Sequence, residues 1–376
     1  MIPQRMYIVP LEGADVRFLG GSARARNARV AARAGAAAGV LGELPAYGTN
    51  LVLLVPPGTA LMLPLFSDPA VTDVAHDGLA RRLDAPDGAS VYIGPAAALA
   101  PLAGQQGRLE ALPRQPLASD CVLNLTTGRA RQRATTVALL ATGKASDGVI
   151  SRTFNRPISR ACSRVALSLG MSATAASVFT LLVGLACAWI AAQPGYLPFV
   201  LTGVLFHLAS VLDGVDGEIA RATLTESEQG ARVDTVVDQL TYVTCFAGMV
   251  VGWVREGSGR LALLSAVFIG LALLASLVRA GRFVAQHAEN ASFVWVDRSV
   301  RRAAADTGRL PLRAAAGLFT LLRRDLFAVI FLGVSLTGQR VLVPALILAG
   351  VLVANLTLTV YATELADAAA ALRARR

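Results

Sequence analysis

The apolar and polar positions of this 376-residue chain follow two patterns, and the change between them falls near residue 140. Before that point, short apolar runs of strand length alternate with polar and Ala-rich segments. Beyond it, most apolar runs approach about 20 residues, the length that an α-helix needs to cross a bilayer. The pattern therefore predicts a small domain in water followed by a domain of membrane-spanning helices.

The first 140 residues have the pattern of an α/β domain. The strand-like runs are RMYIVP, NLVLLVPP, ALMLPLF and SVYIGP. The stretch ARARNARVAARAGAAAGVL, between the first two runs, has the composition of a helix. Alternating strand and helix signals are typical of a layered α/β fold. We therefore expect residues 1–140 to form a small cytosolic α/β domain.

Residues 141–170 predict a linker and an amphipathic helix. Ile150, Phe154, Ile158 and Val165 can share one helical face, and a row of arginines occupies another. A helix of this kind can lie in the membrane interface, where its arginines meet anionic headgroups. The alternative is an ordinary surface helix packed on the N-terminal domain. The membrane-like segment that follows favours the interfacial helix.

Six apolar runs follow and predict six transmembrane helices. They lie near 173–192, 197–215, 233–254, 261–280, 325–338 and 341–362, and the fifth is the shortest. Arginines concentrate in the 279–324 connection and at the C-terminus, which the positive-inside rule places in the cytoplasm. The prediction is a six-helix integral membrane domain over 171–365 and a basic cytoplasmic tail over 366–376. The protein would be a multi-pass protein of the cytoplasmic (inner) membrane with both termini in the cytoplasm.

Composition narrows the classes of partner and cofactor. A net charge of +10 suits nucleic acid or an anionic membrane surface. The positive charge is almost all arginine, and aromatic residues do not interleave with it, so we expect no nucleic-acid partner. The four cysteines form no C-x-x-C pair, which predicts buried thiols rather than a disulfide framework or a zinc site.

Four aspartates at the cytoplasmic ends of the second and third spans carry the candidate chemistry. Asp213 and Asp216 are three residues apart, and Asp234 and Asp238 are four apart, so each pair shares a helix face. Two antiparallel helices can bring all four carboxylates together, where they cannot all stay ionised without cations. Oxygen ligands without Cys or His predict magnesium or manganese, with calcium as a possible occupant. Helix capping and salt bridges could explain one of these aspartates, but not easily four at this spacing.

The residues between the aspartates indicate a phosphorylated ligand. Gly217, Ala220 and Gly230 are small and let a ligand approach the helices closely. Arg221 offers a fork of donors that suits a phosphate. Metal ions, a small-residue platform and an arginine together predict a site for a phosphorylated molecule.

The motif D-x-x-D-G-x-x-A-R, then eight residues, then G-x-x-x-D-x-x-x-D resembles the signature of the CDP-alcohol phosphotransferases. Every fixed position is present between Asp213 and Asp238, and the resemblance extends over about residues 145–365. It implies an enzyme that cleaves a CDP-linked donor, such as CDP-diacylglycerol, passes the substituted phosphate to an acceptor hydroxyl and releases CMP. It also implies a homodimer.

The resemblance implies a role for each residue of the motif. Two Mg²⁺ or Mn²⁺ ions would be held by Asp213, Asp216, Asp234 and Asp238. Asp238 would also be the general base that takes the proton of the acceptor. The CDP-linked donor would contact Asp213, Gly217, Ala220, Arg221 and Gly230.

Arginine clusters predict the acceptor site. The candidate residues are Arg279 and Arg282 after the fourth span, Arg323, Arg324 and Asp325 before the fifth, and Arg152 and Asn155 ahead of the first. The Arg-Arg-Asp sequence and the stretch around Asn155 resemble the subgroup that uses inositol phosphates. A phosphorylated acceptor such as inositol phosphate or glycerol phosphate is one interpretation. The alternative is that these arginines anchor helix ends at lipid headgroups.

Some members of that subgroup carry a cytidylyltransferase domain ahead of the membrane domain. Residues 1–140 resemble such a domain in size, position and strand–helix rhythm. Gly20 and Gly21 are present, but no lysine precedes Lys144 and no P-loop motif occurs. We therefore expect a degenerate, inactive nucleotidyltransferase-like domain.

Two alternatives to this function remain open. One is a bifunctional enzyme whose N-terminal domain also makes the CDP-alcohol. The other is a cation-binding membrane protein or transporter. The sequence shows no internal repeat, and its aspartates lie near one membrane face, whereas a transporter is expected to place acidic residues near the middle of the bilayer.

Overall fold

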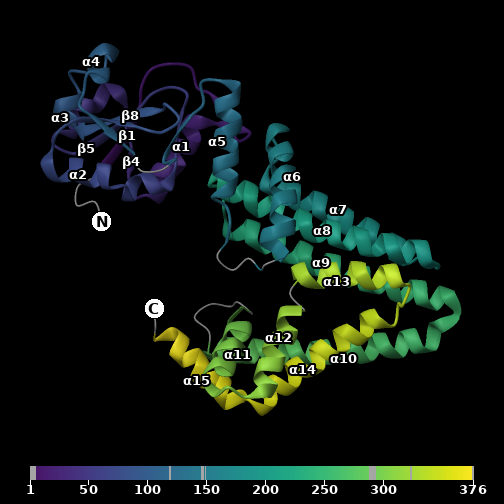
Figure 1. Ribbon diagram of the computed structural model, residues 1–376. Coiled ribbons are helices and arrows are strands. Elements are labelled where there is room, and N and C mark those ends of the chain that lie inside the picture. Colours follow the sequence, from purple (N-terminus) through teal and green to yellow (C-terminus); the bar gives the residue numbers. More distant parts are fainter. Residues whose placement is uncertain are drawn as a thin grey trace. The chain divides into compact units, whose positions relative to one another are not determined.

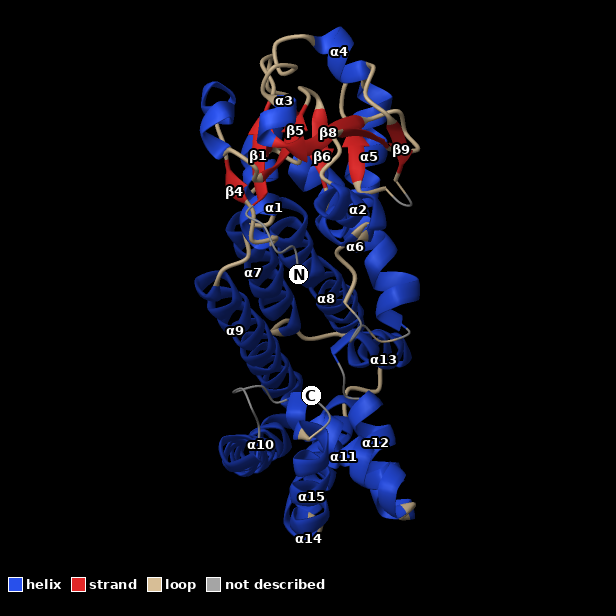
Figure 2. Cartoon of the chain, turned by 90° about the vertical axis from the view of Figure 1, so that its left-hand side faces the viewer, coloured by secondary structure: helices blue, strands red, loops and turns tan. Residues whose placement is uncertain are grey.

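The computed structural model describes residues 6–117, 120–144, 148, 150–287, 294–321 and 324–374. The chain divides into two compact units. The first comprises Met1–Asp147, Ile158–Ala176 and Val215–Ala231, and the second comprises Gly148–Pro157, Ser177–Gly214 and Arg232–Arg376. Across the described residues, the strands gather in the N-terminal part and the rest is helical (Figure 2).

The first unit begins with an α/β domain, as the strand and helix signals predicted. Its strands are β1 (Met6–Pro10), β2 (Arg17–Phe18), β3 (Gly21–Ser22), β4 (Ala37–Ala38), β5 (Leu51–Val55), β6 (Thr59–Leu61), β7 (Arg81–Asp84), β8 (Ser90–Pro95), β9 (Arg114–Pro116) and β10 (Val122–Asn124). Its helices are α1 (Ala23–Arg33), α2 (Pro69–Asp77), α3 (Ala96–Leu99), α4 (Gln106–Glu110), α5 (Gly128–Leu140) and the 3₁₀ turns η1 (Leu41–Tyr47) and η2 (Leu63–Ser67).

Six strands form a mixed sheet in the order β4-β1-β5-β8-β7-β9. Strand β1 runs parallel to β4 and β5, whereas β8 runs antiparallel to β5 and β7. Successive side chains of β5 point to opposite faces, and both faces are buried. Leu51 and Leu53 pack with Val30 of α1, while Val52 and Leu54 belong to the cluster on the other face. Burial on both faces explains why β5 is an unbroken apolar run.

Two predicted elements of this domain differ in extent. The Ala-rich helix ends at Arg33, because Gly35 adopts a left-handed φ of +76° and the chain continues as edge strand β4. Only the start of the predicted ALMLPLF strand lies in a strand, where β6 pairs with β10. The rest forms η2, in which Pro64 suits the first turn.

The interfacial segment forms helix α6 (Arg156–Ser168) after the short π-helix η3 (Ser151–Asn155). The apolar face predicted from the spacing remains exposed, since Ile158 and Val165 are 47% and 59% accessible. Exposed apolar side chains on an amphipathic helix are expected where the helix meets lipid.

The remaining elements are helical. They are α7 (Ala173–Ala191), α8 (Tyr196–Thr223), α9 (Glu228–Trp253), the π-helix η4 (Val254–Ser258), α10 (Gly259–His287), α11 (Val294–Thr307), α12 (Leu310–Leu321), α13 (Arg324–Thr337), α14 (Leu342–Val360) and α15 (Ala362–Arg373). Among the described residues, five helices are long and apolar enough to cross a membrane, namely α7, α8, α9, α10 and α14. These helices indicate a multi-pass membrane protein.

The predicted fifth span is shorter than the other five. Helix α13 has 14 residues and is about 21 Å long at 1.5 Å per residue, against a hydrocarbon core of about 30 Å. It nevertheless packs in the core of the second unit. The ring of Phe331 lies 5.2 Å from that of Phe206 on α8, edge to face. Five of the six predicted spans are therefore long apolar helices, and the remaining one, α13, is a short apolar helix.

Helices α7 and α9 approach closely, and Figure 1 shows them running alongside α8. A Cβ atom on Gly252 would lie 2.5 Å from the carbonyl oxygen of Ala191, and one on Gly248 would meet the carbonyl of Ala188. Small residues four apart are a common means of close helix packing in membranes. The spacing GMVVG carried this signal in the sequence.

Candidate functional site

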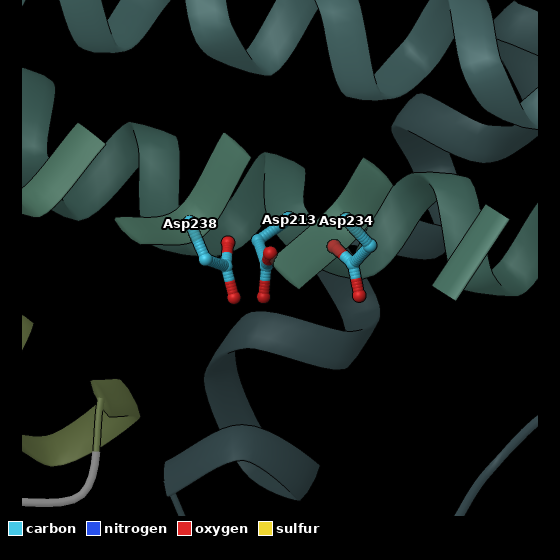
Figure 3. Close-up of side chains that lie close together, drawn as sticks. All are labelled: Asp213, Asp234 and Asp238. Atoms are coloured by element: carbon cyan, nitrogen blue, oxygen red, sulfur yellow. The ribbon is translucent and has the colours of Figure 1, made fainter. Parts of the chain in front are cut away.

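Three of the four motif aspartates form a cluster. Ligand oxygens of Asp213 on α8 and of Asp234 and Asp238 on α9 all lie within 4.8 Å of one another. Figure 3 shows the three side chains pointing to the same side of the helix pair. Asp234 and Asp238 share a face because they are four residues apart. The short connection between α8 and α9 returns the chain so that Asp213 lies beside them.

The charges of this cluster favour a cation. Two carboxylates 4.8 Å apart repel by about 3 kcal/mol at an effective dielectric constant of about 20. A divalent ion between them offsets this repulsion, and half-buried oxygen ligands suit hard cations such as Mg²⁺ or Mn²⁺. The donor set therefore fits a metal site, although it does not identify the metal.

Asp216, the fourth predicted ligand, is more deeply buried than the other three. It lies on α8 three residues after Asp213 and is 7% exposed. One of its carboxylate oxygens accepts the N–H of Gly217. The cluster of three does not include it, and its role as a metal ligand stays a prediction.

The small residues and the arginine of the motif have local structural roles. A Cβ atom on Gly217 would lie 2.9 Å from Nη1 of Arg221, so glycine leaves room for the guanidinium. Nε of Arg221 donates to the carbonyl of Thr142, at 2.9 Å. Gly230 is exposed in the first turn of α9, where its N–H donates to Oγ of Ser227 at 3.0 Å. Ala220 is half-buried on α8. Their contacts with a donor stay predictions.

Two of the predicted acceptor segments meet in the structure. Arg152 and Asn155 lie in η3, which contacts α13, the helix that begins with Arg324 and Asp325. Asn155 is 6% exposed, and its Oδ1 has no hydrogen-bond partner among the described residues. A buried oxygen without a donor is costly, so a ligand hydroxyl would stabilise it. Arg323 and the side chains of Arg324 and Asp325 lie outside what the structure describes.

The third predicted acceptor segment lies on α10. Arg279 donates through Nη1 to Oδ1 of Asn355 on α14. Nδ2 of Asn355 in turn donates to Oγ of Ser276, at 2.6 Å. Arg282 is exposed. The sequence interpretation missed Asn355, although a lone asparagine within an apolar run is a recognisable signal of helix–helix hydrogen bonding.

Comparison with known proteins bears on this site. Residues 171–338 match the model of the CDP-alcohol phosphatidyltransferase family. The chain is similar to proteins named "Bifunctional IPC transferase and DIPP synthase". It is 37% identical over 111 residues to that of Thermococcus kodakarensis, covering 30% of this chain and 24% of the relative. It is 33% identical over 133 residues to that of Archaeoglobus fulgidus, covering 35% and 26%. It is 37% identical over 93 residues to that of Aquifex aeolicus, covering 25% and 21%.

Residues 171–338, which hold the aspartate motif, therefore form a domain of the CDP-alcohol phosphatidyltransferase family, an enzyme family. The named relatives match the inositol-phosphate subgroup that the Arg-Arg-Asp sequence resembles. The matched segments span only about a quarter of the length of the first two relatives.

Proposed function

We propose that this protein passes a substituted phosphate from a CDP-linked donor to an acceptor hydroxyl and releases CMP, in phospholipid or inositol-phosphodiester synthesis. The donor would be CDP-diacylglycerol or a CDP-polyol. The carboxylate cluster of Asp213, Asp234 and Asp238, inside the segment that matches the family, carries this proposal. Family membership argues against the alternative of a transporter or a non-enzymatic cation-binding protein.

In this reaction, the four motif aspartates would bind the metal ions, and one of them would act as the general base. Asp213, Asp216, Asp234 and Asp238 would hold two Mg²⁺ or Mn²⁺ ions, which would neutralise the diphosphate and the departing CMP. A carboxylate oxygen of Asp238 takes the proton of the acceptor hydroxyl. The acceptor oxygen bonds to the phosphorus that carries the alcohol, and the bond from that phosphorus to the CMP oxygen breaks.

The substrates would be held by the residues around the cluster. Arg221 binds a donor phosphate, and Gly217, Ala220 and Gly230 make room for the cytidine. The acceptor, inositol phosphate or glycerol phosphate, would be bound by residues of three segments. These residues are Arg152 and Asn155, then Arg323, Arg324 and Asp325, and finally Arg279 and Arg282. The unpaired Oδ1 of Asn155 supports this placement, because a polyol hydroxyl could donate to it.

The membrane orientation is also part of the proposal. The arginine-rich connections and the C-terminus would lie in the cytoplasm, as the positive-inside rule requires. The site would then face the cytoplasm at the inner membrane, where soluble acceptors are available. A homodimer is expected for this family.

The names of the relatives favour the bifunctional alternative over a transferase alone. The N-terminal domain contains a cavity of about 320 Å³ at the carboxyl ends of the parallel strands β1 and β5, lined by Asp15, Arg24, Asn27 and others. Open α/β sheets bind ligands in the crevice at this edge. A domain that makes the CDP-alcohol is therefore the second candidate, in place of the inactive domain predicted from the missing lysine.

One set of assays tests both candidates. Purified full-length protein with Mg²⁺ is given CDP-diacylglycerol or a CDP-polyol and a panel that includes inositol phosphate and glycerol phosphate, and CMP is measured. Absence of CMP with every pair would refute the transferase. Labelled CTP with a polyol phosphate tests the second candidate, which requires pyrophosphate release. Asp238→Asn should lose CMP release and keep pyrophosphate release.

A further inference from the structure

Helix α8 ends at Thr223, two residues after Arg221, the arginine of the motif. Leu224, the first residue after the helix, adopts a left-handed φ of +58°. The N–H of Thr225 donates to the carbonyl of Ala220 at 2.9 Å, and the N–H of Leu224 donates to that of Arg221 at 3.3 Å. This is the Schellman arrangement, which satisfies two of the last four carbonyls of a helix. The carbonyls of the next two residues therefore need other donors.

The N-terminal domain supplies those donors from α1. Nε of Arg26 donates to the carbonyl of Ala222 at 2.9 Å, and Nε of Arg29 donates to that of Thr223 at 2.8 Å. Both guanidinium groups also meet the negative end of the helix dipole, where a cation is favoured. The end of α8 is thus capped by two arginines from a segment nearly 200 residues earlier in the chain.

Arg26 is built into the domain that carries it. It is 3% exposed, and its Nη1 donates to the carbonyl of Leu61 at 2.6 Å. Burial, with a smaller contribution from the charge of Arg29, lowers the pKa of Arg26 to about 10, so it stays protonated at neutral pH. Burying a cation costs free energy unless its donors are all hydrogen-bonded, and those hydrogen bonds then fix the orientation of the side chain. Arg26 therefore fixes the end of α8 against the domain core.

Three further contacts join the same helix end to the same domain. Leu224 packs against the apolar core cluster that includes Val30 of α1. Arg33 forms an ion pair with Glu226. Arg221 donates from Nε to the carbonyl of Thr142, just beyond α5. All of these residues belong to the first compact unit.

We infer that Arg26 and Arg29 are positioning residues of the transferase site, because they hold the C-terminal end of α8 and thereby aim Arg221 at the donor phosphate. The inference rests on the donor role proposed for Arg221. The N-terminal domain would then contribute to donor binding by the transferase, whether or not that domain has an activity of its own.

The test compares Arg29→Gln, Arg26→Gln and Arg26→Lys in the full-length chain in lipid nanodiscs. With CDP-diacylglycerol as the donor probe, Arg29→Gln should raise the donor KM about tenfold and leave kcat within about twofold. Arg26→Lys keeps the charge and one donor, so it should recover part of the loss seen in Arg26→Gln. The Mn²⁺ affinity of all three variants should match the wild type, because the three clustered aspartates are unchanged.

Hydrogen exchange of the amides in residues 219–226 gives a readout that does not depend on the donor. It should be faster in Arg29→Gln and unchanged in Arg133→Gln, the matched control. Arg133 is a surface arginine of the same domain that pairs with Asp120 at 3.3 Å. A purely structural role would lower the melting temperature without changing the donor KM.

Two results would overturn the inference. One is a donor KM within about twofold of wild type in both Arg29→Gln and Arg26→Gln. The other is unchanged exchange at 219–226 in Arg29→Gln. Failure of the proposed function would appear elsewhere, as normal CMP release by Asp238→Asn or an unchanged donor KM in Arg221→Ala.

Discussion

Glu218, fully buried on α8, accepts hydrogen bonds from Oγ of Ser159 and of Ser163 on α6, each at 2.7 Å. The two serines are four residues apart, so their side chains lie on the same face of α6. A buried carboxylate needs donors to offset the loss of water. This contact therefore fastens the amphipathic helix to the helix that carries the first half of the aspartate motif.

Removing these hydroxyls should destabilise the protein. Ser159→Ala or Ser163→Ala is expected to cost about 1.5–3 kcal/mol of unfolding free energy, because each removes a charge-assisted hydrogen bond from a buried group. Ser168→Ala is the control, since its Oγ donates to the nearby carbonyl of Val165 on an exposed face. Denaturant unfolding of the detergent-solubilised chain measures the difference. Equal costs for Ser159→Ala and Ser168→Ala would show that the buried contact does not matter.

Asp238→Asn should abolish turnover and leave the fold intact. An amide cannot take the acceptor proton, and loss of a general base lowers kcat by about 10²–10⁴-fold. Loss of a metal ligand would add to this. Asp367→Asn, on the exposed face of α15, is the matched control and should keep wild-type CMP release. Turnover of Asp238→Asn near the wild-type rate would remove this residue from the role of base.

Metal removal should stop the reaction reversibly. Excess chelator is expected to abolish CMP release, and added Mg²⁺ or Mn²⁺ should restore it, since the clustered carboxylates need a divalent ion. In Asp234→Asn, the metal concentration for half-maximal activity should rise by about tenfold or more, because a ligand is lost. Full activity in excess chelator would contradict the metal assignment.

Gly203→Ala should weaken the contact between α8 and α13. A Cβ atom at Gly203 would clash with Oγ of Ser335 and lie 3.2 Å from Cα of Leu332. The cost is expected to be about 1–3 kcal/mol, as for other overpacked sites. Gly333→Ala on α13 has no neighbour within 4 Å of its added Cβ and should be neutral or stabilise by up to about 1 kcal/mol. Unfolding measurements that fail to separate these two variants would exclude close α8–α13 packing.

Several features followed from local sequence patterns. The spacing of Asp234 and Asp238 predicted that both lie on one helix face, and of the two α8 aspartates predicted to join them, Asp213 lies in the cluster and Asp216 does not. The five long apolar runs became five long apolar helices, because length and composition alone decide that property. The run NLVLLVPP predicted a strand, which is β5.

Other features did not follow from any local pattern. The short apolar run after Asp325 forms the 14-residue helix α13, and no local pattern specifies that its Phe331 packs against Phe206 of α8. The Ala-rich helix ended early because Gly35 takes a left-handed conformation. Asn355 gave a hydrogen-bonding signal, yet its partner Arg279 lies on another helix and could not be identified from spacing.

The sequence by itself determined most of the helices, strands and apolar spans, and which side chains share a helix face, because these properties depend on residues close together in the chain. Only the tertiary structure decided which groups satisfy one another across the chain. The carbonyl of Ala222 meets Arg26, 196 positions away, and Glu218 meets Ser159, 59 positions away. Such pairings depend on how whole elements pack and on where a buried polar group finds its donor, and no local periodicity encodes either.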